Sequence, residues 1–232
     1  MELLILGHVL GDFYFQTDQL ADRKKISIEY GMMHGGIYAF IVGILLILQV
    51  SSVKLWMGIV FVTFLDHVVV DYVKVLIERK YESYKCQIFC WDQMFHVISL
   101  FGISYVFELN CSIENIAILI SALICWKPAS IFIALVLEQF KLIDIEEENK
   151  NQEICDIGVA KSGMYIGVLE REIILLLGVI GQGSAIGFVL AAKSIARYKQ
   201  LEAKNFAEKY LIGTLLSALI SILCIVVCTV LT

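Results

Sequence analysis

The sequence has a single proline and no surplus of positive charge: 18 Lys and Arg stand against 23 Asp and Glu, for a formal net charge of -5 over 232 residues. Nucleic-acid binding takes its affinity from clustered Lys and Arg, so a nucleic-acid partner is not expected. The seven cysteines are odd in number and scattered, which predicts no disulfide framework. Met1 and Glu2 lack the basic start of a signal peptide, so no cleavable signal is expected.

Charged residues of both signs are few, at 18%, whereas hydrophobic residues make up 59% of the chain and the mean hydropathy is +0.81. A soluble domain is usually nearer half apolar. A helix needs roughly 20 apolar residues to cross the hydrocarbon core. We therefore predict an all-α, polytopic transmembrane helix bundle with seven or eight membrane segments, the first being short and either re-entrant or tilted. The apolar segments fall at about 2–16, 34–50, 55–77, 91–109, 113–137, 161–181, 184–199 and 207–231.

Lys and Arg gather in alternate connections between these segments, and the other connections contain only Lys54. By the positive-inside rule, the basic connections are predicted to be cytoplasmic. The polar residues described next then lie at similar depth, near the cytoplasmic ends of their segments. The first two basic connections hold Arg23, Lys24 and Lys25, and Arg79, Lys80 and Lys85.

Three of the four histidines have an aspartate four residues away, within strongly apolar sequence. On a helix this spacing puts both side chains on one face, one turn apart. Ionisable groups at membrane depth are costly and usually face the protein interior, so the pairs predict one shared polar site between helices. Gly7 and Gly11 flank the first pair, and such small residues let a second helix approach closely. The pairs are His8 with Asp12, His67 with Asp71, and Asp92 with His96.

Imidazole and carboxylate groups together favour a divalent transition metal, with zinc as the first expectation and manganese or iron(II) as alternatives. His34 is predicted at the same depth and joins the set, and it and Asp92 are expected as ligands or proton carriers. The set exceeds what one tetrahedral ion needs, so either two ions share it or one ion leaves some groups to orient the others. Cys86 and Cys90 are interpreted as small apolar side chains rather than ligands. The candidate metal ligands are His8, Asp12, His34, His67, Asp71, Asp92 and His96.

A bound ion would lower the pKa of its water to about 7 and polarise a phosphoryl or carbonyl oxygen. Asp66, Asp71 or Asp92 could then take the proton. Lys74 follows His67 by two helical turns on the same face and could neutralise a phosphate. An anchoring role at the helix end is the alternative for Lys74. The candidate catalytic residues are Asp92, Asp66 and Lys74.

A polar run with three consecutive glutamates from Glu146 interrupts the apolar pattern. Such composition predicts a flexible cytosolic connection. The chain is therefore predicted to contain a metal-site helix bundle at 1–138, a polar cytosolic connection at 139–160 and a C-terminal helix bundle at 161–232.

Several stretches resemble the domain-of-unknown-function family 3307, an uncharacterised bacterial integral membrane family. They are G-H-V-L-G-D-F-Y-F-Q-T-D-Q-L-A-D-R-K, then His34, D-H-V-V-V-D-Y-V-K and D-Q-M-F-H, with I-G-V-L-E-R, A-A-K-S-I-A-R and Y-L-I-G-T-L-L-S later, as in longer members. This resemblance implies a multi-pass protein of the bacterial cytoplasmic membrane and no particular activity. More distantly, helical H-x-x-x-D pairs look like those of predicted membrane-bound metal-dependent hydrolases related to phospholipase C, an analogy of pattern.

Three functions are compatible with these residues. The leading hypothesis is a membrane-embedded metal-dependent enzyme that hydrolyses a phosphoester or another lipid-linked bond at the cytoplasmic leaflet. The first alternative is a metal-ion or proton-coupled transporter, which predicts polar groups continuing to the far face. The second is a non-enzymatic membrane subunit that recruits a cytosolic protein through its charged connections. Membrane lipids are the expected partners in each case, and the glycine-rich helix faces allow a homo-oligomer.

Overall fold

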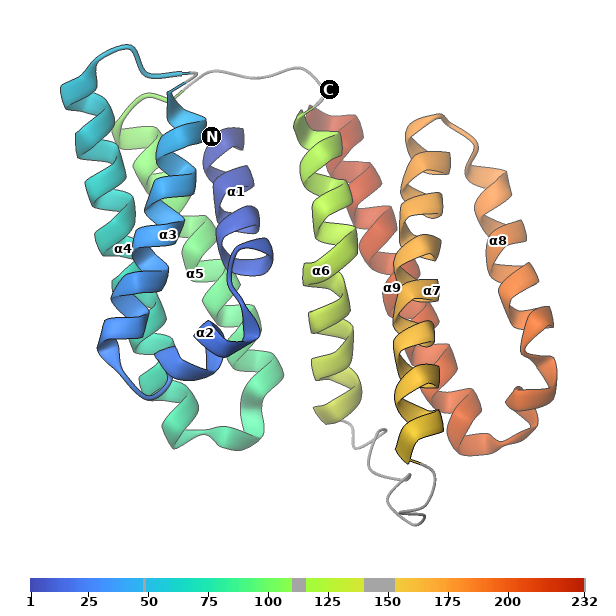
Figure 1. The fold of residues 1–232 in the computed structure, drawn as a ribbon. Helices are drawn as coiled ribbons and strands as arrows, with labels where there is room; N and C mark the ends of the chain where they lie inside the picture. The colour runs from blue at the N-terminus through green and yellow to red at the C-terminus, as the bar shows by residue number, and fades with distance from the viewer. Residues whose placement is uncertain (48, 110–115, 140–152, 232) are drawn as a thin grey trace. The chain divides into compact units, whose positions relative to one another are not determined.

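The computed structural model describes residues 1–47, 49–109, 116–139 and 153–231, and its regular elements in these ranges are all helices (Figure 1). The predicted all-α class is therefore confirmed. The chain divides into two compact units, Met1–Ile116 and Ala117–Thr232, which we call unit 1 and unit 2. The domain boundary expected after residue 138 stays a prediction. Most of the expected polar connection, 140–152, lies outside the described residues, and α7 begins at Glu153.

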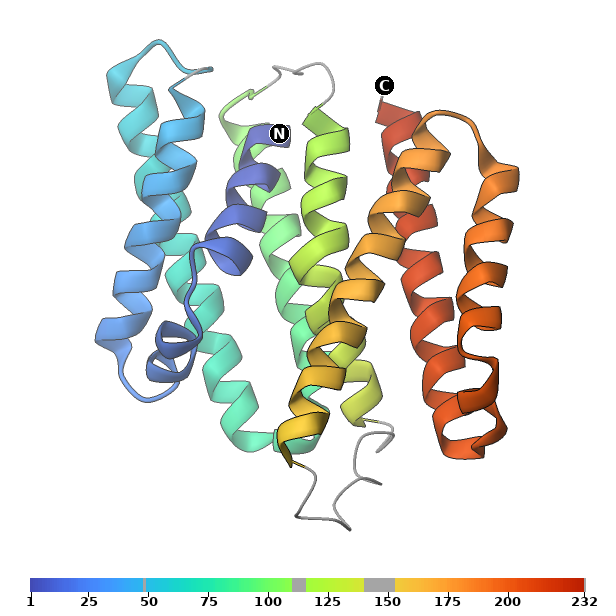
Figure 2. The ribbon, with the colours of Figure 1, turned by 45° about the vertical axis from the view of Figure 1, so that its right-hand side comes forward.

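In its described residues, unit 1 consists of five α-helices, a π-helical turn and a short 3-10 helix (Glu82–Tyr84). Helix α3 packs against α4, α4 against α5, and the short α1 against both α3 and α5. The long α3 and α4 lie side by side and are joined by a short connection (Figures 1 and 2). The elements are α1 (Glu2–Val9), a π-helical turn (Leu10–Tyr14), α2 (Asp18–Lys24), α3 (Ile28–Leu46), α4 (Val53–Lys80) and α5 (Lys85–Val106).

Side-chain caps mark where α2 and α4 begin. The Thr17 hydroxyl accepts a hydrogen bond from the Leu20 amide at 3.3 Å at the start of α2, and Ser52 accepts one from the Leu55 amide at 3.5 Å at the start of α4. Such caps satisfy amides that have no partner within the helix. They set the starting points from which α2 and α4 carry Lys24 and His67 to the interior.

Close helix contacts in unit 1 depend on glycine. A Cβ atom added to Gly7 would meet Val42 Cγ2 at 2.7 Å, and one added to Gly11 would meet Tyr38 Cδ2 at 2.7 Å. These distances are shorter than any ordinary carbon contact, so a larger residue would push α1 away from α3. The expectation that Gly7 and Gly11 admit a neighbouring helix beside His8 is confirmed.

Over its described residues, unit 2 contains four α-helices and a short 3-10 helix (Tyr198–Glu202) around a small apolar core. Helix α7 packs against α9 and α8, and α8 folds back from α7 through a short turn (Figure 2). Cys125, Leu175 and Cys224 form the buried centre. The helices are α6 (Ile116–Gln139), α7 (Glu153–Val179), α8 (Gly183–Ala196) and α9 (Lys204–Leu231).

Four helices of the described chain are long and apolar enough to cross a membrane, which indicates a multi-pass membrane protein. The expected seven or eight membrane segments are therefore wrong in number. Helices α1 and α8 have only 8 and 14 residues, short of the roughly 20 needed, and α5 and α7 carry charged and polar side chains along their length. The candidate spans are Ile28–Leu46, Val53–Lys80, Ile116–Gln139 and Phe206–Val230.

Candidate metal centre

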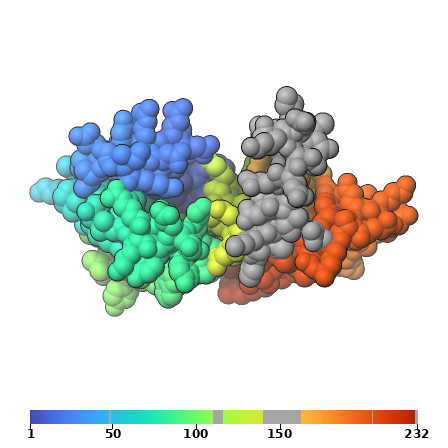
Figure 3. Space-filling model, turned by 90° about the horizontal axis from the view of Figure 1, so that it is seen from below, coloured from blue at the N-terminus to red at the C-terminus, as the bar shows by residue number. Residues whose placement is uncertain are grey.

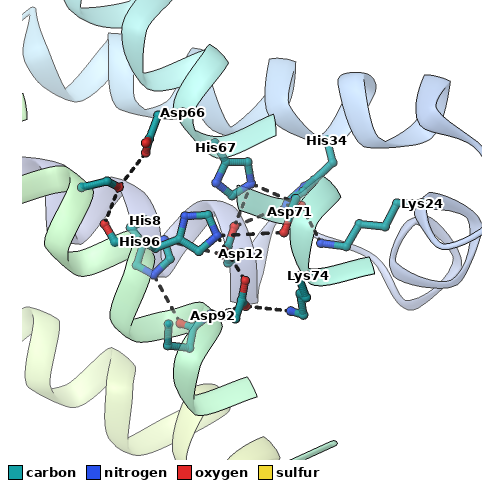
Figure 4. Close-up of polar contacts among 12 residues, drawn as sticks. His8, Asp12, Lys24, His34, Asp66, His67, Asp71, Lys74, Asp92 and His96 are labelled. Atoms are coloured by element: carbon teal, nitrogen blue, oxygen red, sulfur yellow. Dashed lines mark hydrogen bonds and ion pairs between the residues drawn. The ribbon is translucent and has the colours of Figure 1, made fainter. Parts of the chain in front are cut away.

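The seven candidate ligands come from four helices and the π-helical turn and meet inside unit 1 (Figure 4). Six of the seven are buried, and the Asp12 side chain is 8% exposed. Their elements are α1 for His8, the π-helical turn for Asp12, α3 for His34, α4 for His67 and Asp71, and α5 for Asp92 and His96.

The π-helical turn delivers Asp12. Its widened ring is closed by a hydrogen bond from the Phe15 amide to the Leu10 carbonyl at 2.9 Å, five residues back. π-helical turns are rare in proteins overall, and those that occur are often found at functional sites. The turn keeps the expected pairing on one face, with His8 Nδ1 3.5 Å from Asp12 Oδ2.

Asp12, His34 and His67 form the first cluster, which we call the Asp12 group; their ligand atoms lie within 4.8 Å of one another. Asp12 Oδ1 is 3.3 Å from His34 Nε2 and 3.4 Å from His67 Nε2, and none of these three atoms has a hydrogen-bond partner among the described residues. Hydrogen bonds from N–H to oxygen are usually about 2.7–3.2 Å long. Ligands at 2.0–2.1 Å from a tetrahedral zinc ion are instead about 3.3–3.4 Å apart, which fits the observed separations.

Asp71, Asp92 and His96 form the second cluster, the Asp92 group. His96 Nε2 lies 3.5 Å from Asp92 Oδ1 and 4.0 Å from Asp71 Oδ1. Both His96 Nε2 and Asp92 Oδ1 are buried without a hydrogen-bond partner among the described residues. This group is more widely spaced than the Asp12 group.

Asp71 connects the two groups through its two oxygens. Its Oδ2 lies 3.7 Å from His34 Nε2 and 3.6 Å from His67 Nε2, whereas its Oδ1 faces His96. Asp12 is divided in the same way, with Oδ1 toward the Asp12 group and Oδ2 toward His8. Each carboxylate thus has an oxygen on either side, an arrangement that can hold a metal ion at one position or two.

In the part of the chain that the structure describes, Asp71 and Asp92 each pair with a partly buried lysine, whereas Asp12 does not. Lys24 Nζ donates to Asp71 Oδ2 at 2.8 Å, and Lys74 Nζ donates to Asp92 Oδ2 at 2.7 Å. The ion-pair partners of Asp12 among the described residues are histidines alone. A buried carboxylate without a cation is costly, so the Asp12 group is where a positive charge is most needed. Lys24 was not predicted as a site residue, because in the sequence it stands in a basic connection like any other.

Further side chains hold the imidazoles in place. Tyr38 stacks on His67 with ring centroids 3.8 Å apart and an interplanar angle of 12°. Gln93 Oε1 accepts a hydrogen bond from His8 Nε2 at 3.3 Å, and the Gln93 amide nitrogen donates to Asp92 Oδ2 at 3.1 Å. Groups that orient ligands in this way commonly tune a metal site.

Asp66, Cys86 and Cys90 belong to neither group. Asp66 Oδ2 accepts a hydrogen bond from Ser99 at 2.6 Å and contacts neither group (Figure 4). Cys86 is half-buried and Cys90 is exposed. Burial and the neighbouring Cys90 raise the pKa of the Cys86 thiol, which disfavours the thiolate that a metal ion would require.

The comparisons with known proteins concern mainly unit 1. No curated protein and no solved structure matches the chain. One family model matches residues 1–141, which is more than half of the chain and includes every residue of both groups. Because of this match, the chain belongs to the family described as protein of unknown function (DUF3307).

Proposed function

We propose that the protein is a membrane-embedded, metal-dependent hydrolase that acts on a phosphoester or another lipid-linked bond at the cytoplasmic leaflet of a bacterial membrane. One observation carries the proposal: six buried nitrogen and oxygen atoms without hydrogen-bond partners among the described residues converge from separate elements. Native proteins rarely leave such atoms unpaired, and a cluster of them calls for a ligand. The atoms are His8 Nδ1, Asp12 Oδ1, His34 Nε2, His67 Nε2, Asp92 Oδ1 and His96 Nε2.

We place the metal ion in the Asp12 group, where Asp71 would provide the fourth ligand. Two imidazole nitrogens and two carboxylate oxygens suit zinc, with manganese or iron(II) as alternatives. One divalent ion would compensate Asp12, while Lys24 and Lys74 already compensate Asp71 and Asp92. Charge therefore favours the Asp12 group as the first position to be filled.

The remaining residues have assignable tasks in hydrolysis. The ion would supply a water of lowered pKa and polarise the scissile phosphoryl or carbonyl oxygen. Asp92 Oδ1, which is unpaired and 3.5 Å from His96 Nε2, is placed to accept a proton. Lys74 holds the other oxygen of Asp92 and can turn its ammonium toward an anionic group. Asp66 is the weaker candidate for the general base, because its Oδ2 already accepts a hydrogen bond from the Ser99 hydroxyl.

The apolar layer next to the cluster supports an enzyme over the transporter. The buried hydroxyls of Thr63 and Ser104 in this layer bond backbone carbonyls. A transport path would need polar groups that continue across the bilayer. In the described part of unit 1 the cluster is instead closed on the side away from Lys74. The buried core on that side, one or more turns farther along the same helices, consists of Leu4, Val42, Leu46, Ile59 and Leu100.

The remaining expectations on partners stay proposals. A subunit that recruits a cytosolic protein would do so through its charged connections, and the most acidic one, at 140–152, lies outside the described residues. Association of the chain with itself is likewise a prediction.

Elemental analysis of the purified full chain tests the proposal. We expect one or two equivalents of a transition metal in the wild type, and loss of that metal in a His67→Ala, Asp71→Ala double variant. Asp18→Asn is the matched control, because Asp18 is an exposed carboxylate on α2. Wild type is then screened for hydrolysis of inner-leaflet phospholipids and soluble phosphoesters. Wild type without metal, after preparation free of chelators, would refute the metal centre, and liposome flux without turnover would favour the transporter.

A further inference from the structure

A groove on the outside of unit 1 leads to the Asp92 group. It runs between α4 and α5 and has a volume of about 330 Å³, within the usual range of ligand pockets. Its walls are apolar and outward-facing: Val69, Val73 and Ile77 are 59%, 47% and 42% exposed on α4, and Trp91 and Phe95 are 58% and 54% exposed on α5. In a membrane protein such walls face hydrocarbon rather than water.

The inner end of the groove is charged. Lys74 and Asp92 are the two charged residues among those that line it, and they pair at 2.7 Å. The Lys74 side chain keeps 19% of its surface exposed, whereas that of Asp92 keeps 2%. The second oxygen of Asp92 faces His96 inside the cluster. One ion pair therefore has the groove on one side and the candidate metal centre on the other.

The position of Lys74 along α4 matches the level of lipid headgroups. Lys74 lies in the last two turns of α4, which ends with Arg79 and Lys80. Basic side chains at the end of a membrane helix reach toward the headgroup layer. Figure 3 looks onto this end of unit 1, where α2 in blue and the connection between α4 and α5 in green lie side by side. A lipid that laid its chain in the groove would thus bring its headgroup to Lys74.

We propose that the groove binds the hydrocarbon chain of an anionic lipid and that Lys74 binds the phosphate of that lipid beside Asp92. The inference rests on the proposed function, because it names the substrate class of the same site. A lysine ammonium has three donors, and the bond to Asp92 leaves donors for a phosphate oxygen. The apolar walls add the burial of the chain, which contributes about 0.8 kcal/mol per methylene group.

A lipid chain fits this groove better than a protein helix does. A covering helix with an apolar face would bury the Lys74 ammonium without offering it a second acceptor. The phosphate of a lipid offers that acceptor, and free phosphate would offer it without the chain.

Binding to the full chain in nanodiscs tests the proposal without any requirement for turnover or metal. Each disc contains phosphatidylcholine with a small fraction of phosphatidic acid, and the lipid retained per chain is counted after exchange into detergent. We expect wild type to retain phosphatidic acid about tenfold over phosphatidylcholine. Lys74→Met should abolish this preference, and Lys74→Arg should keep most of it.

A second pair of variants separates the groove from general folding. Val73→Trp fills the groove and should reduce retention of both lipids, whereas Val62→Trp adds the same ring at a position of α4 that is 37% exposed and outside the groove, and should change nothing. Equal retention of the two lipids by wild type would overturn the proposal, and so would an unchanged preference in Lys74→Met. Displacement of the lipid by inorganic phosphate at equal concentration would also overturn it, since the chain would then contribute nothing. Retained preference without hydrolysis would refute only the hydrolase.

Discussion

Both units bury charge in an apolar bundle, but they satisfy it differently. In unit 2, Arg171 is 2% exposed and its guanidinium donates to four acceptors, so its hydrogen-bonding capacity is largely used. In unit 1, the Nε2 atoms of His34 and His67 lie 3.3–3.7 Å from carboxylate oxygens of Asp12 and Asp71 and form no hydrogen bond with them. The acceptors of Arg171 are the carbonyls of Cys125 and Trp126 and the hydroxyls of Ser130 and Ser217.

The difference separates a structural network from a binding site. A saturated buried network rigidifies helix packing, and it has no capacity left for a ligand. Glu170 in unit 2 also has one unpaired oxygen, but its other oxygen pairs with Lys193 and no imidazole faces it. Among the described residues, both groups of possible metal ligands lie in unit 1.

Removal of the guanidinium in unit 2 should have the largest effect on stability. Arg171→Met removes four hydrogen bonds, two of them fully buried, and we expect the free energy of unfolding to fall by about 3–5 kcal/mol. Thermal unfolding of the full chain in detergent measures the change, and Lys199→Met on the exposed turn after α8 is the control. The metal content of the folded fraction should stay at the wild-type value. Loss of metal in folded Arg171→Met would mean that the two units are coupled, and it would contradict the distinction between a structural network in unit 2 and a binding site in unit 1.

Within unit 1, Asp12→Asn should weaken ion binding more than Asp92→Asn. Both changes preserve side-chain size, but only Asp12 lacks a lysine partner. We expect the zinc affinity of the full chain to fall at least a hundredfold for Asp12→Asn. For Asp92→Asn we expect a fall of about tenfold, because we assign Asp92 to orienting neighbouring groups and accepting a proton rather than to holding the ion. Calorimetric zinc titration measures both. Equal losses would place the ion between the two groups rather than in the Asp12 group.

A pair of adjacent glycines tests how tightly the site is packed. A Cβ added to Gly35 would meet Val68 Cγ2 at 2.4 Å, whereas one added to Gly36 would meet nothing within 4 Å. The Val68 side chain is β-branched and cannot easily rotate away from the added methyl group. Gly35→Ala should therefore cost about 1–3 kcal/mol of stability. It should also move α3, and with it His34, away from α4. Gly36→Ala should stay within about 0.5 kcal/mol of wild type. Indistinguishable melting temperatures for the two variants would contradict the close packing.

The smallest effect is expected for Gln93→Leu. This change removes the hydrogen bonds to His8 Nε2 and Asp92 Oδ2 but no candidate ligand. A net loss of about 1 kcal/mol, or a few-fold in zinc affinity, is expected for one such orienting contact. The zinc titration used for Asp12→Asn measures it. A loss as large as that of Asp12→Asn would make Gln93 part of the coordination itself.

Local spacing explains why much of the candidate site was predictable. A separation of four residues places both side chains of a pair on one helix face wherever the helix lies, so His67 with Asp71 and Asp92 with His96 needed no tertiary information. The apolar composition likewise predicted an all-α membrane protein. The number of membrane segments was overestimated, because apolar stretches such as α1 and α8 form helices too short to cross the bilayer.

The sequence by itself determined the residue types of the site and the helix faces that carry them, since both follow from local periodicity. Tertiary structure alone decided which oxygen of Asp71 faces which imidazole, that Lys24 arrives from α2 to pair with it, and that Asp66 turns to Ser99 instead. These contacts join residues far apart in the chain. Their geometry depends on how helices pack around Gly7, Gly11 and Gly35, and no spacing along a single helix encodes it.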